Sequence, residues 1–226
     1  MAISREKLAK MMDSTVVKAT ATKNEIEKLC KEAIQYGLGC ICVNPVYVKM
    51  AATLLKDSNV KVCSTISFPF GASLPEIKAS EAVRAVENGA EELDMVINLS
   101  ALKSGDYECV KKDIAAVVDV KRLSNEVIVK VIIETAYLTN EEKIIACKLV
   151  KEAGADFVKT STGLFGKGAT VEDVRLMRQT VGTDIGVKAA GGIRTYADAI
   201  AMVEAGANRI GTSTAVAIIK GGPTSF

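Results

Sequence analysis

The stretch "CKLVKEAGADFVKT" (residues 147–160) contains, in order, a helical apolar pattern, a glycine and a short apolar run. Gly154 follows the last apolar position of the helical pattern and suits the left-handed conformation that often ends a helix. The run "DFV" after it has the composition of a buried strand. The stretch therefore predicts a helix, a glycine stop and a strand, in that order.

The same order recurs along the chain. Three further segments combine a helical pattern, a glycine and an apolar run: "CKEAIQYGLGCICV" with Gly37, "AVRAVENGAEELDMVI" with Gly89 and "AMVEAGANRIGT" with Gly206. Helix starts of the capping-box type, with Ser or Thr followed three residues later by an acid, are predicted at "TKNE" (22–25), "SLPE" (73–76), "TNEE" (139–142), "TVED" (170–173) and "TYAD" (195–198). Such alternation predicts parallel strands joined by right-handed crossovers.

Eight strand candidates follow from this pattern. They are residues 10–15, 39–44, 60–68, 92–98, 127–135, 156–161, 185–190 and 208–213. Eight strands in 226 residues are typical of a (β/α)₈ TIM barrel, which is commonly about 250 residues long. We expect a single domain over residues 1–226, with a short N-terminal helix. An open doubly wound sheet is the alternative, although no G-x-G-x-x-G motif follows the first strand.

Composition excludes several classes of function. The net charge of +2 and the lack of a basic run with aromatics argue against nucleic acid as a partner. No apolar stretch approaches the roughly 20 residues of a membrane span, so no membrane partner is expected. The six cysteines contain no CxxC pair and predict reduced thiols in a cytoplasmic protein. The absence of histidine excludes histidine-based zinc, general-base and triad chemistry.

Polar side chains collect at the ends of the predicted strands. They are Asp13, Asp94, Glu134, Lys159 and Lys188. A single strand lysine is usually a snorkelling side chain or part of a satisfied ion pair. Two lysines at equivalent places on successive strands are different, because desolvating two like charges costs several kcal/mol unless acids compensate or a proton leaves.

A lysine that has lost its proton is a nucleophile. At the usual pKa of about 10.4, only about 0.04% of lysine side chains are neutral at pH 7, and lowering the pKa to about 7 requires roughly 4–5 kcal/mol. Burial and a neighbouring ammonium can supply that energy. The neutral amine can attack a carbonyl and form a Schiff base, whose iminium accepts electrons. We therefore expect one of the two lysines to be the nucleophile and the other to keep it neutral.

Glycine-rich loops suggest a phosphate site. "AAGGIRTYADA" (189–199) places Gly191, Gly192 and Arg194 after the seventh strand, and "RIGTSTAVAII" (209–219) places Gly211, Thr212 and Ser213 after the eighth. Loops at these two places commonly bind phosphate in this fold. The loop "STGLFGKGAT" (161–170), with Gly163, adds a third wall.

With these residues assembled, the chain resembles the deoxyribose-phosphate aldolase family of class I (β/α)₈ aldolases. The likeness runs from about residue 8 to 220 and rests on "FVKTSTG", "GVKAAGGIR", "ELDMVIN", "CVNP" (42–45) and "KVIIET" (130–135), which occur in the expected order. The resemblance implies reversible cleavage of 2-deoxy-D-ribose 5-phosphate to acetaldehyde and D-glyceraldehyde 3-phosphate.

The resemblance also implies roles for single residues. Lys159 corresponds to the Schiff-base lysine, Lys188 to the lysine that tunes its pKa and relays protons, and Asp94 to the acid–base carboxylate that acts through a bound water. Asp13 and Thr15 match a D-x-T motif; Asp13 either orients Lys188 or is a satisfied structural acid. Cys42 corresponds to an active-site cysteine, for which we expect a lining role.

Three departures from the family pattern are visible. Ser14 stands where many members have histidine, and we expect little catalytic effect. Lys167 occupies a loop usually richer in small residues, where it either contacts phosphate or is a solvated charge. No tyrosine follows Tyr196, so the proton-transfer role of a C-terminal tyrosine found in some members has no counterpart in this chain.

Two other functions use the same fold. A phosphate-binding isomerase or synthase would use lysine as a plain acid without a covalent adduct. A non-catalytic sugar-phosphate sensor would bind without turnover. For the aldolase we expect no metal and no organic cofactor, and a homodimer is a possible assembly.

Overall fold

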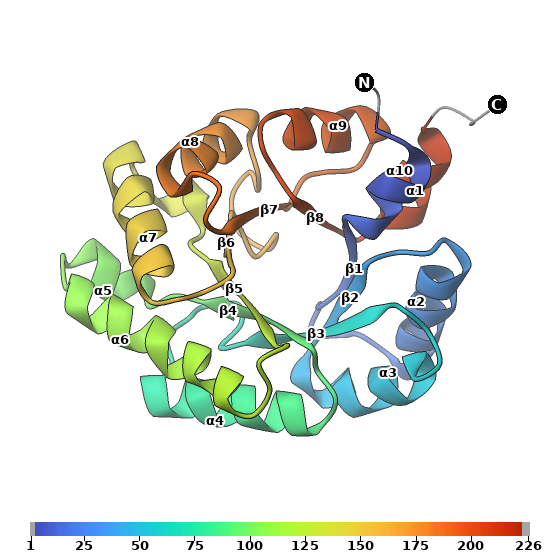
Figure 1. The fold of residues 1–226 in the computed structure, drawn as a ribbon, viewed down its shortest axis with the longest axis horizontal. Coiled ribbons are helices and arrows are strands. Elements are labelled where there is room, and N and C mark those ends of the chain that lie inside the picture. Colours follow the sequence, from blue (N-terminus) through green and yellow to red (C-terminus); the bar gives the residue numbers. More distant parts are fainter. Residues whose placement is uncertain (1–2, 223–226) are drawn as a thin grey trace.

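The computed structural model describes residues 3–222, in which eight parallel strands close into a barrel, with β8 hydrogen-bonded to β1 (Figure 1). The strands are β1 (Met12–Val16), β2 (Cys40–Val43), β3 (Lys61–Ile66), β4 (Glu92–Val96), β5 (Ile128–Ile132), β6 (Phe157–Lys159), β7 (Gly186–Ala190) and β8 (Arg209–Thr212). The (β/α)₈ barrel is therefore confirmed, and the open sheet is excluded because β1 and β8 are paired.

Helices surround the barrel on its outside (Figure 1). They are α1 (Arg5–Lys10), α2 (Lys23–Gln35), α3 (Val48–Leu55), α4 (Pro75–Glu87), α5 (Leu99–Lys103), α6 (Tyr107–Val118), α7 (Asn140–Glu152), α8 (Val171–Val181), α9 (Tyr196–Glu204) and α10 (Ala215–Gly221), with 3₁₀ segments η1 (Pro45–Tyr47), η2 (Asp119–Arg122) and η3 (Thr135–Tyr137). Within residues 3–222, none of these helices has the length and apolar character that crossing a membrane requires.

All eight predicted strands are present, although most are shorter than predicted at one or both ends. The short N-terminal helix is α1. Capping boxes form at Thr22, Thr139 and Thr195, and Thr170 accepts the amide of Asp173 at the start of α8. The four glycines expected to end helices all have positive φ.

The capping box predicted at "SLPE" is wrong. Helix α4 begins at Pro75 with Leu74 as its N-cap, and no side chain caps it. Proline suits the first helical position because its missing N–H would have no partner there, so the proline sets where the helix begins. Ser73 lies outside the helix, and its amide donates to the hydroxyl of Ser67 at 3.3 Å.

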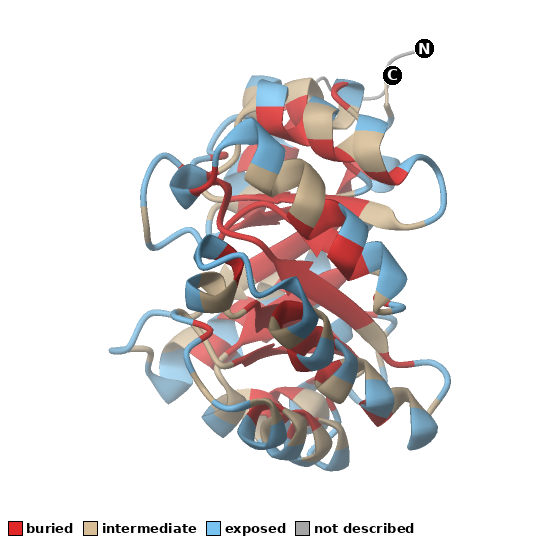
Figure 2. Cartoon of the chain, turned by 90° about the vertical axis from the view of Figure 1, so that its left-hand side faces the viewer, coloured by how far each residue is buried: buried red, intermediate tan, exposed pale blue. Residues whose placement is uncertain are grey.

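The barrel separates two kinds of core. Alternate strand residues such as Ile41, Leu93 and Val187 are buried in the apolar core that the helices complete. The strand residues between them face the barrel interior and are largely charged or thiol-bearing. Figure 2 shows the strands as the most completely buried part of the molecule. The interior of this barrel is therefore a buried polar core.

A buried ion pair supports the carboxyl end of β4 from outside. Lys78 on α4 donates to Asp113 on α6 at 2.7 Å and to the carbonyl of Val96 at 2.8 Å, and both charged side chains are fully buried. Asp113 also accepts the amide of Asn98 at 3.0 Å. Because Val96 and Asn98 follow Asp94 closely in the chain, this pair fixes the strand that carries the central acid of the barrel.

We predict that Asp113→Ala lowers the free energy of unfolding by about 3–5 kcal/mol, because it leaves the Lys78 ammonium buried without its partner. Denaturant titration followed by circular dichroism measures the change. Lys111→Ala, on the same helix, is the control: its 3.0 Å pair with Glu152 is solvent-exposed, and its loss should cost less than about 1 kcal/mol. Equal losses in the two variants would contradict a supporting role for the buried pair.

Candidate active site

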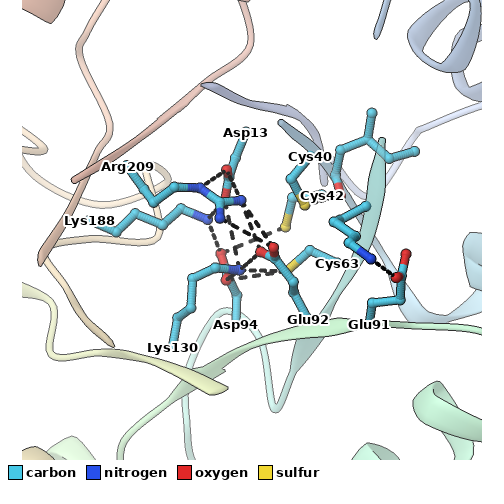
Figure 3. A network of polar contacts seen from close by, with 12 residues as sticks. Asp13, Cys40, Cys42, Cys63, Glu91, Glu92, Asp94, Lys130, Lys188 and Arg209 are labelled. Atoms are coloured by element: carbon cyan, nitrogen blue, oxygen red, sulfur yellow. Dashed lines mark hydrogen bonds and ion pairs between the residues drawn. The ribbon is translucent and has the colours of Figure 1, made fainter. Parts of the chain in front are cut away.

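Six side chains, five of them buried and Arg209 14% exposed, form a closed ring of alternating charge inside the barrel. They come from β1, β4, β5, β7 and β8, and the order around the ring is Arg209, Asp13, Lys188, Asp94, Lys130, Glu92 and back to Arg209 (Figure 3). In this order, the successive N···O distances are 2.6, 2.5, 2.6, 2.9, 2.6 and 3.0 Å. Each charge thus has a partner of opposite sign on both sides, which is what makes their burial tolerable.

Lys159 contacts this ring as a seventh ionisable group. Its Nζ lies 2.6 Å from Oδ2 of Asp94, the same oxygen that Lys188 contacts at 2.6 Å. The two lysines are register partners on β6 and β7, so their side chains leave the sheet at the same level. The structure therefore brings together the three residues for which the sequence predicts catalytic roles.

Each acid of the ring is already paired with cations of the ring, so no carboxylate is left to pair with Lys159 alone. The three acids are matched by two lysines and one arginine, so a protonated Lys159 would add an unbalanced positive charge to the buried interior. An unbalanced ion in such surroundings costs several kcal/mol. Lys159 therefore shares an acid that Lys188 and Lys130 already contact.

The pKa shifts of the ring members agree with this charge distribution. Burial alone would raise the pKa of Asp13, but neighbouring cations, Lys188 first among them, hold it well below its usual value. The pKa of Asp94 is likewise low despite burial, chiefly because of the charge on Lys130. Burial would lower the pKa of Lys188, yet Asp13 and Asp94 raise it. Lys188 therefore stays an ammonium ion beside Lys159.

Thiols line the part of the interior next to Asp94. Cys63 donates to Oδ1 of Asp94 at 3.2 Å, and Cys42 lies 3.8 Å from Oδ2. Cys42 thus contacts the central acid and is almost completely buried, and its lining role stays a prediction. Two groups of possible metal ligands, Cys42–Cys63–Asp94 and Asp13–Cys40–Glu92, lie in this region. Their carboxylates already bind ammonium or guanidinium groups, which disfavours a further cation there.

A cavity of about 490 Å³ opens above Lys159 at the carboxyl ends of the strands. Lys159 is 4% exposed and lies at its floor, whereas Lys188 and Asp94 are fully buried beneath. All seven residues predicted to bind phosphate line this cavity: Gly163, Gly191, Gly192, Arg194, Gly211, Thr212 and Ser213. Thr15 also lines it, and its hydroxyl donates to the carbonyl of Asp13 at 3.0 Å.

Glycines bring two of these loops into close contact. A side chain on Gly191 would meet the backbones of Gly163 and Gly168 at about 3.1 and 3.0 Å, and all three glycines have positive φ. In the part of the chain that the structure describes, the amides of Gly163, Gly191 and Gly192 donate to no protein group. Free amides in a concave loop are suited to an anion. Gly211 has a different use, since a Cβ there would lie 3.1 Å from Cε of Lys188.

Two predicted phosphate contacts need comment. The hydroxyl of Thr212 donates to the carbonyl of Ile193 at 2.7 Å, so this side chain ties the two loops together. The side chain of Lys167 is exposed, and Lys167 is not among the residues that line the cavity in residues 3–222. Its position fits the solvated charge better than the phosphate contact.

Sequence reasoning missed half of the ring. Lys130, Glu92 and Arg209 received no role, although each has the strand position that faces the interior. Glu92 precedes Asp94 by two residues, and period-two alternation could have placed both on the same face. Glu134, noted only as a strand-end acid, is fully buried with φ of 50° and accepts the amide of Thr162 at 3.0 Å. Burial raises its pKa, which favours the neutral acid.

A larger groove of about 1410 Å³ lies at the opposite, amino-terminal end of the barrel. Two of its charged side chains are already engaged: Lys151 pairs with Asp184, and Arg178 donates to the carbonyls of Gly206 and Ile185 at 3.1 and 2.9 Å. The cavity above Lys159 is the better candidate, because Lys159 at its floor contacts the buried ring.

Known proteins with the same architecture decide the family. Residues 7–221 match the family described as DeoC/LacD family aldolase. The chain belongs to this family. Deoxyribose-phosphate aldolases from Thermoanaerobacter sp. strain X514 and Thermococcus kodakarensis are each 60% identical to it, over 94% and 98% of this chain and 96% and 99% of their own. The tetrameric deoxyribose phosphate aldolase of Aeropyrum pernix is 38% identical, with a TM-score of 0.90 over 96% of this chain and 91% of its own.

Membership of the DeoC/LacD aldolases fits the geometry of the site. The family is one of aldolases, and an aldolase needs a group that stabilises a carbanion next to a carbonyl. In this chain, Lys159 lines the cavity and its amine contacts Asp94 of the buried ring.

The buried acids predict how stability depends on pH. Because the folded-state pKa of Asp13 is lowered, its contribution to stability is present above the unfolded value of about 3.9 and is lost as the pH falls below it. We expect the thermal unfolding temperature to drop steeply between pH 5 and pH 2. Asp13→Asn should start lower at pH 5 and drop less over the same range. Parallel curves of unfolding temperature against pH for the two proteins would contradict the contribution assigned to Asp13.

Proposed function

We propose that this protein is a class I aldolase that reversibly cleaves 2-deoxy-D-ribose 5-phosphate to acetaldehyde and D-glyceraldehyde 3-phosphate. The observation that carries the proposal is Lys159 on the same carboxylate oxygen as Lys188, at the floor of the cavity, with no acid left unmatched in the ring. The 60% identity to deoxyribose-phosphate aldolases over nearly the whole chain supports this choice of substrate.

The reaction begins with attack of the neutral Lys159 amine on the C1 aldehyde of the open-chain sugar. Loss of water from the resulting carbinolamine leaves an iminium ion. The Lys188 ammonium, held by Asp13 and Asp94, supplies the positive charge that keeps Lys159 neutral and can donate a proton to the departing hydroxyl.

Cleavage of the C2–C3 bond follows because the iminium accepts the bonding electrons. The C3 hydroxyl loses its proton and becomes the aldehyde of D-glyceraldehyde 3-phosphate, while C2 becomes the carbon of an enamine. Asp94 acts as the acid–base carboxylate through a water molecule, first taking the hydroxyl proton and then returning one to C2. Hydrolysis of the acetaldehyde imine regenerates Lys159.

The phosphate group is assigned to the loops after β6, β7 and β8. The free amides of Gly163, Gly191 and Gly192 and the side chain of Arg194 supply donors of suitable charge. The residues assigned to complete this wall are Gly211, Thr212 and Ser213. In the aldolase, Asp13 orients Lys188, while Thr15 and Cys42 line the space near it. None of these steps calls for a metal ion or an organic cofactor.

We further propose that residues 1–226 form one catalytic domain and that the enzyme works in the cytoplasm on a small sugar phosphate and an aldehyde. The six free cysteines support a reducing environment. Self-association is supported by the tetramer of the Aeropyrum pernix relative, and the homodimer stays a prediction.

The covalent step separates this proposal from its two alternatives. Incubation with acetaldehyde, reduction with borohydride and mass spectrometry should give a reduced adduct on Lys159. Lys159→Arg should give no adduct and lose activity by more than about 10³-fold, since the guanidinium stays protonated. Lys167→Arg is the control and should behave as the unaltered enzyme. An active enzyme without an adduct would favour a non-covalent isomerase, and binding without turnover would favour a sensor.

The phosphate assignment predicts a selective defect. Arg194→Ala should raise KM for 2-deoxyribose 5-phosphate by roughly 10-fold or more, because a charged hydrogen bond worth about 1.5–3 kcal/mol is lost. Steady-state kinetics with unphosphorylated 2-deoxyribose should show no comparable change. Lys167→Ala, which removes a nearby loop charge outside the cavity, is the matched comparison. A similar rise in KM for both sugars would exclude Arg194 from the phosphate site.

A further inference from the structure

Two members of the ring, Glu92 and Arg209, lie too deep to meet a substrate. Glu92 is two strand positions below Asp94, and Arg209 is two below Gly211. As described over residues 3–222, neither lines the cavity above Lys159. Yet each is buried or nearly so and contacts two other ring members. A pair so placed can influence the reaction only through the charges above it.

We propose that Glu92 and Arg209 form an electrostatic positioning pair that sets the pH at which Lys159 becomes a nucleophile. The inference rests on the proposed aldolase function, because the neutral amine of Lys159 is the quantity the pair controls. It assigns the pair a role beyond holding the barrel together.

Arg209 acts on the charge of Lys188 through Asp13, which contacts both side chains. Its Nε and Nη2 donate to Oδ1 of Asp13 at 2.8 and 2.6 Å, which leaves Oδ2 for Lys188 at 2.5 Å. Asp13 therefore shares its charge between a permanent cation and Lys188. Without the guanidinium, the whole charge of Asp13 would act on Lys188 and the groups around it.

Glu92 acts on the charge of Asp94 through Lys130, which contacts both carboxylates. Its Oε2 lies 2.6 Å from Nζ of Lys130, which in turn lies 2.9 Å from Oδ1 of Asp94. Glu92 thus helps to neutralise Lys130, so that Asp94 is free to act on Lys188 and Lys159. Without that carboxylate, Lys130 would rely on Asp94 and on Asp13, which is further away at 3.7 Å, and the interior would carry one more positive charge.

Every strand contributes a group that faces this network. In strand order, these are Asp13 from β1, Cys40 and Cys42 from β2, Cys63 from β3, Glu92 and Asp94 from β4, Lys130 from β5 with Glu134 just after it, Lys159 from β6, Lys188 from β7 and Arg209 from β8. Lys18, Glu25 and Arg194 line the cavity further out. Within the ring of six, Glu92 and Arg209 are the two members that can be exchanged for neutral residues without removing a direct contact to Lys188, Asp94 or Lys159.

The pair predicts shifts of opposite sign. Glu92→Gln removes a negative charge and leaves a side chain of the same shape, so Lys159 should become neutral at lower pH. Arg209→Gln removes a positive charge, so Lys159 should hold its proton to higher pH. Each shift should be about one pH unit, as expected for a unit charge a few ångströms away in a partly shielded interior.

The test measures the rate at which acetaldehyde and cyanoborohydride label Lys159 as a function of pH. The midpoint should move down for Glu92→Gln and up for Arg209→Gln, and it should return towards that of the unaltered enzyme in the double variant. Arg209→Lys keeps the charge and should leave the midpoint in place, whatever it does to the rate. Circular dichroism at each pH restricts the comparison to folded protein.

The outcomes separate this inference from the proposed function. No label on Lys159 in the unaltered enzyme would refute the aldolase mechanism itself. A normal label with the same midpoint in all the folded variants would overturn only the role of the pair, because a merely structural pair changes the amount of active enzyme and not its titration. If Arg209→Gln does not fold, a lower midpoint for Glu92→Gln beside an unchanged midpoint for Arg209→Lys still decides.

Discussion

Charge neutrality inside a closed barrel is the constraint on which this site depends. Three acids and three cations are buried within hydrogen-bonding distance of one another, and they neutralise one another completely (Figure 3). Water cannot reach most of them to compensate an added charge. In the proposed mechanism, Lys159 shares Asp94 with Lys188, so the reactivity of its amine depends on the charges of the whole ring.

The fold supplies the ring through two simple features. Period-two alternation sends every second strand residue inward, and parallel strands of similar register bring those residues to the same few levels. Lys159 and Lys188 face each other because they are register partners on β6 and β7. Gly211 leaves room for the side chain of Lys188, because a Cβ at position 211 would press against it. Outside the strands, the buried pair of Lys78 and Asp113 fixes the end of β4.

The strands were predictable because each apolar run lies between a glycine and a capped helix, and that signal is local. Local signals also failed once, at "SLPE", where Pro75 and not Ser73 set the start of α4. Lys159 and Lys188 were predictable because an ammonium near the end of a buried strand is conspicuous when it recurs on the next strand. Glu92 and Arg209 were not, because a charge at the start of a strand has the same pattern whether it faces solvent, a helix or the barrel interior. Lys130 lies in the middle of β5, and the acids that its ammonium meets come from other strands.

The amino-acid sequence by itself determined the order of strands and helices, the lack of histidine, the two strand-end lysines and the glycine loops, because each depends on residues close together in the chain. Tertiary structure decided which of the buried charges meet. Asp13 and Arg209 lie at opposite ends of the chain and come within 2.6 Å only because β8 closes on β1. That closure leaves Lys159 to share Asp94 with Lys188 and Lys130, since Coulomb interactions depend on distance in space and not along the sequence.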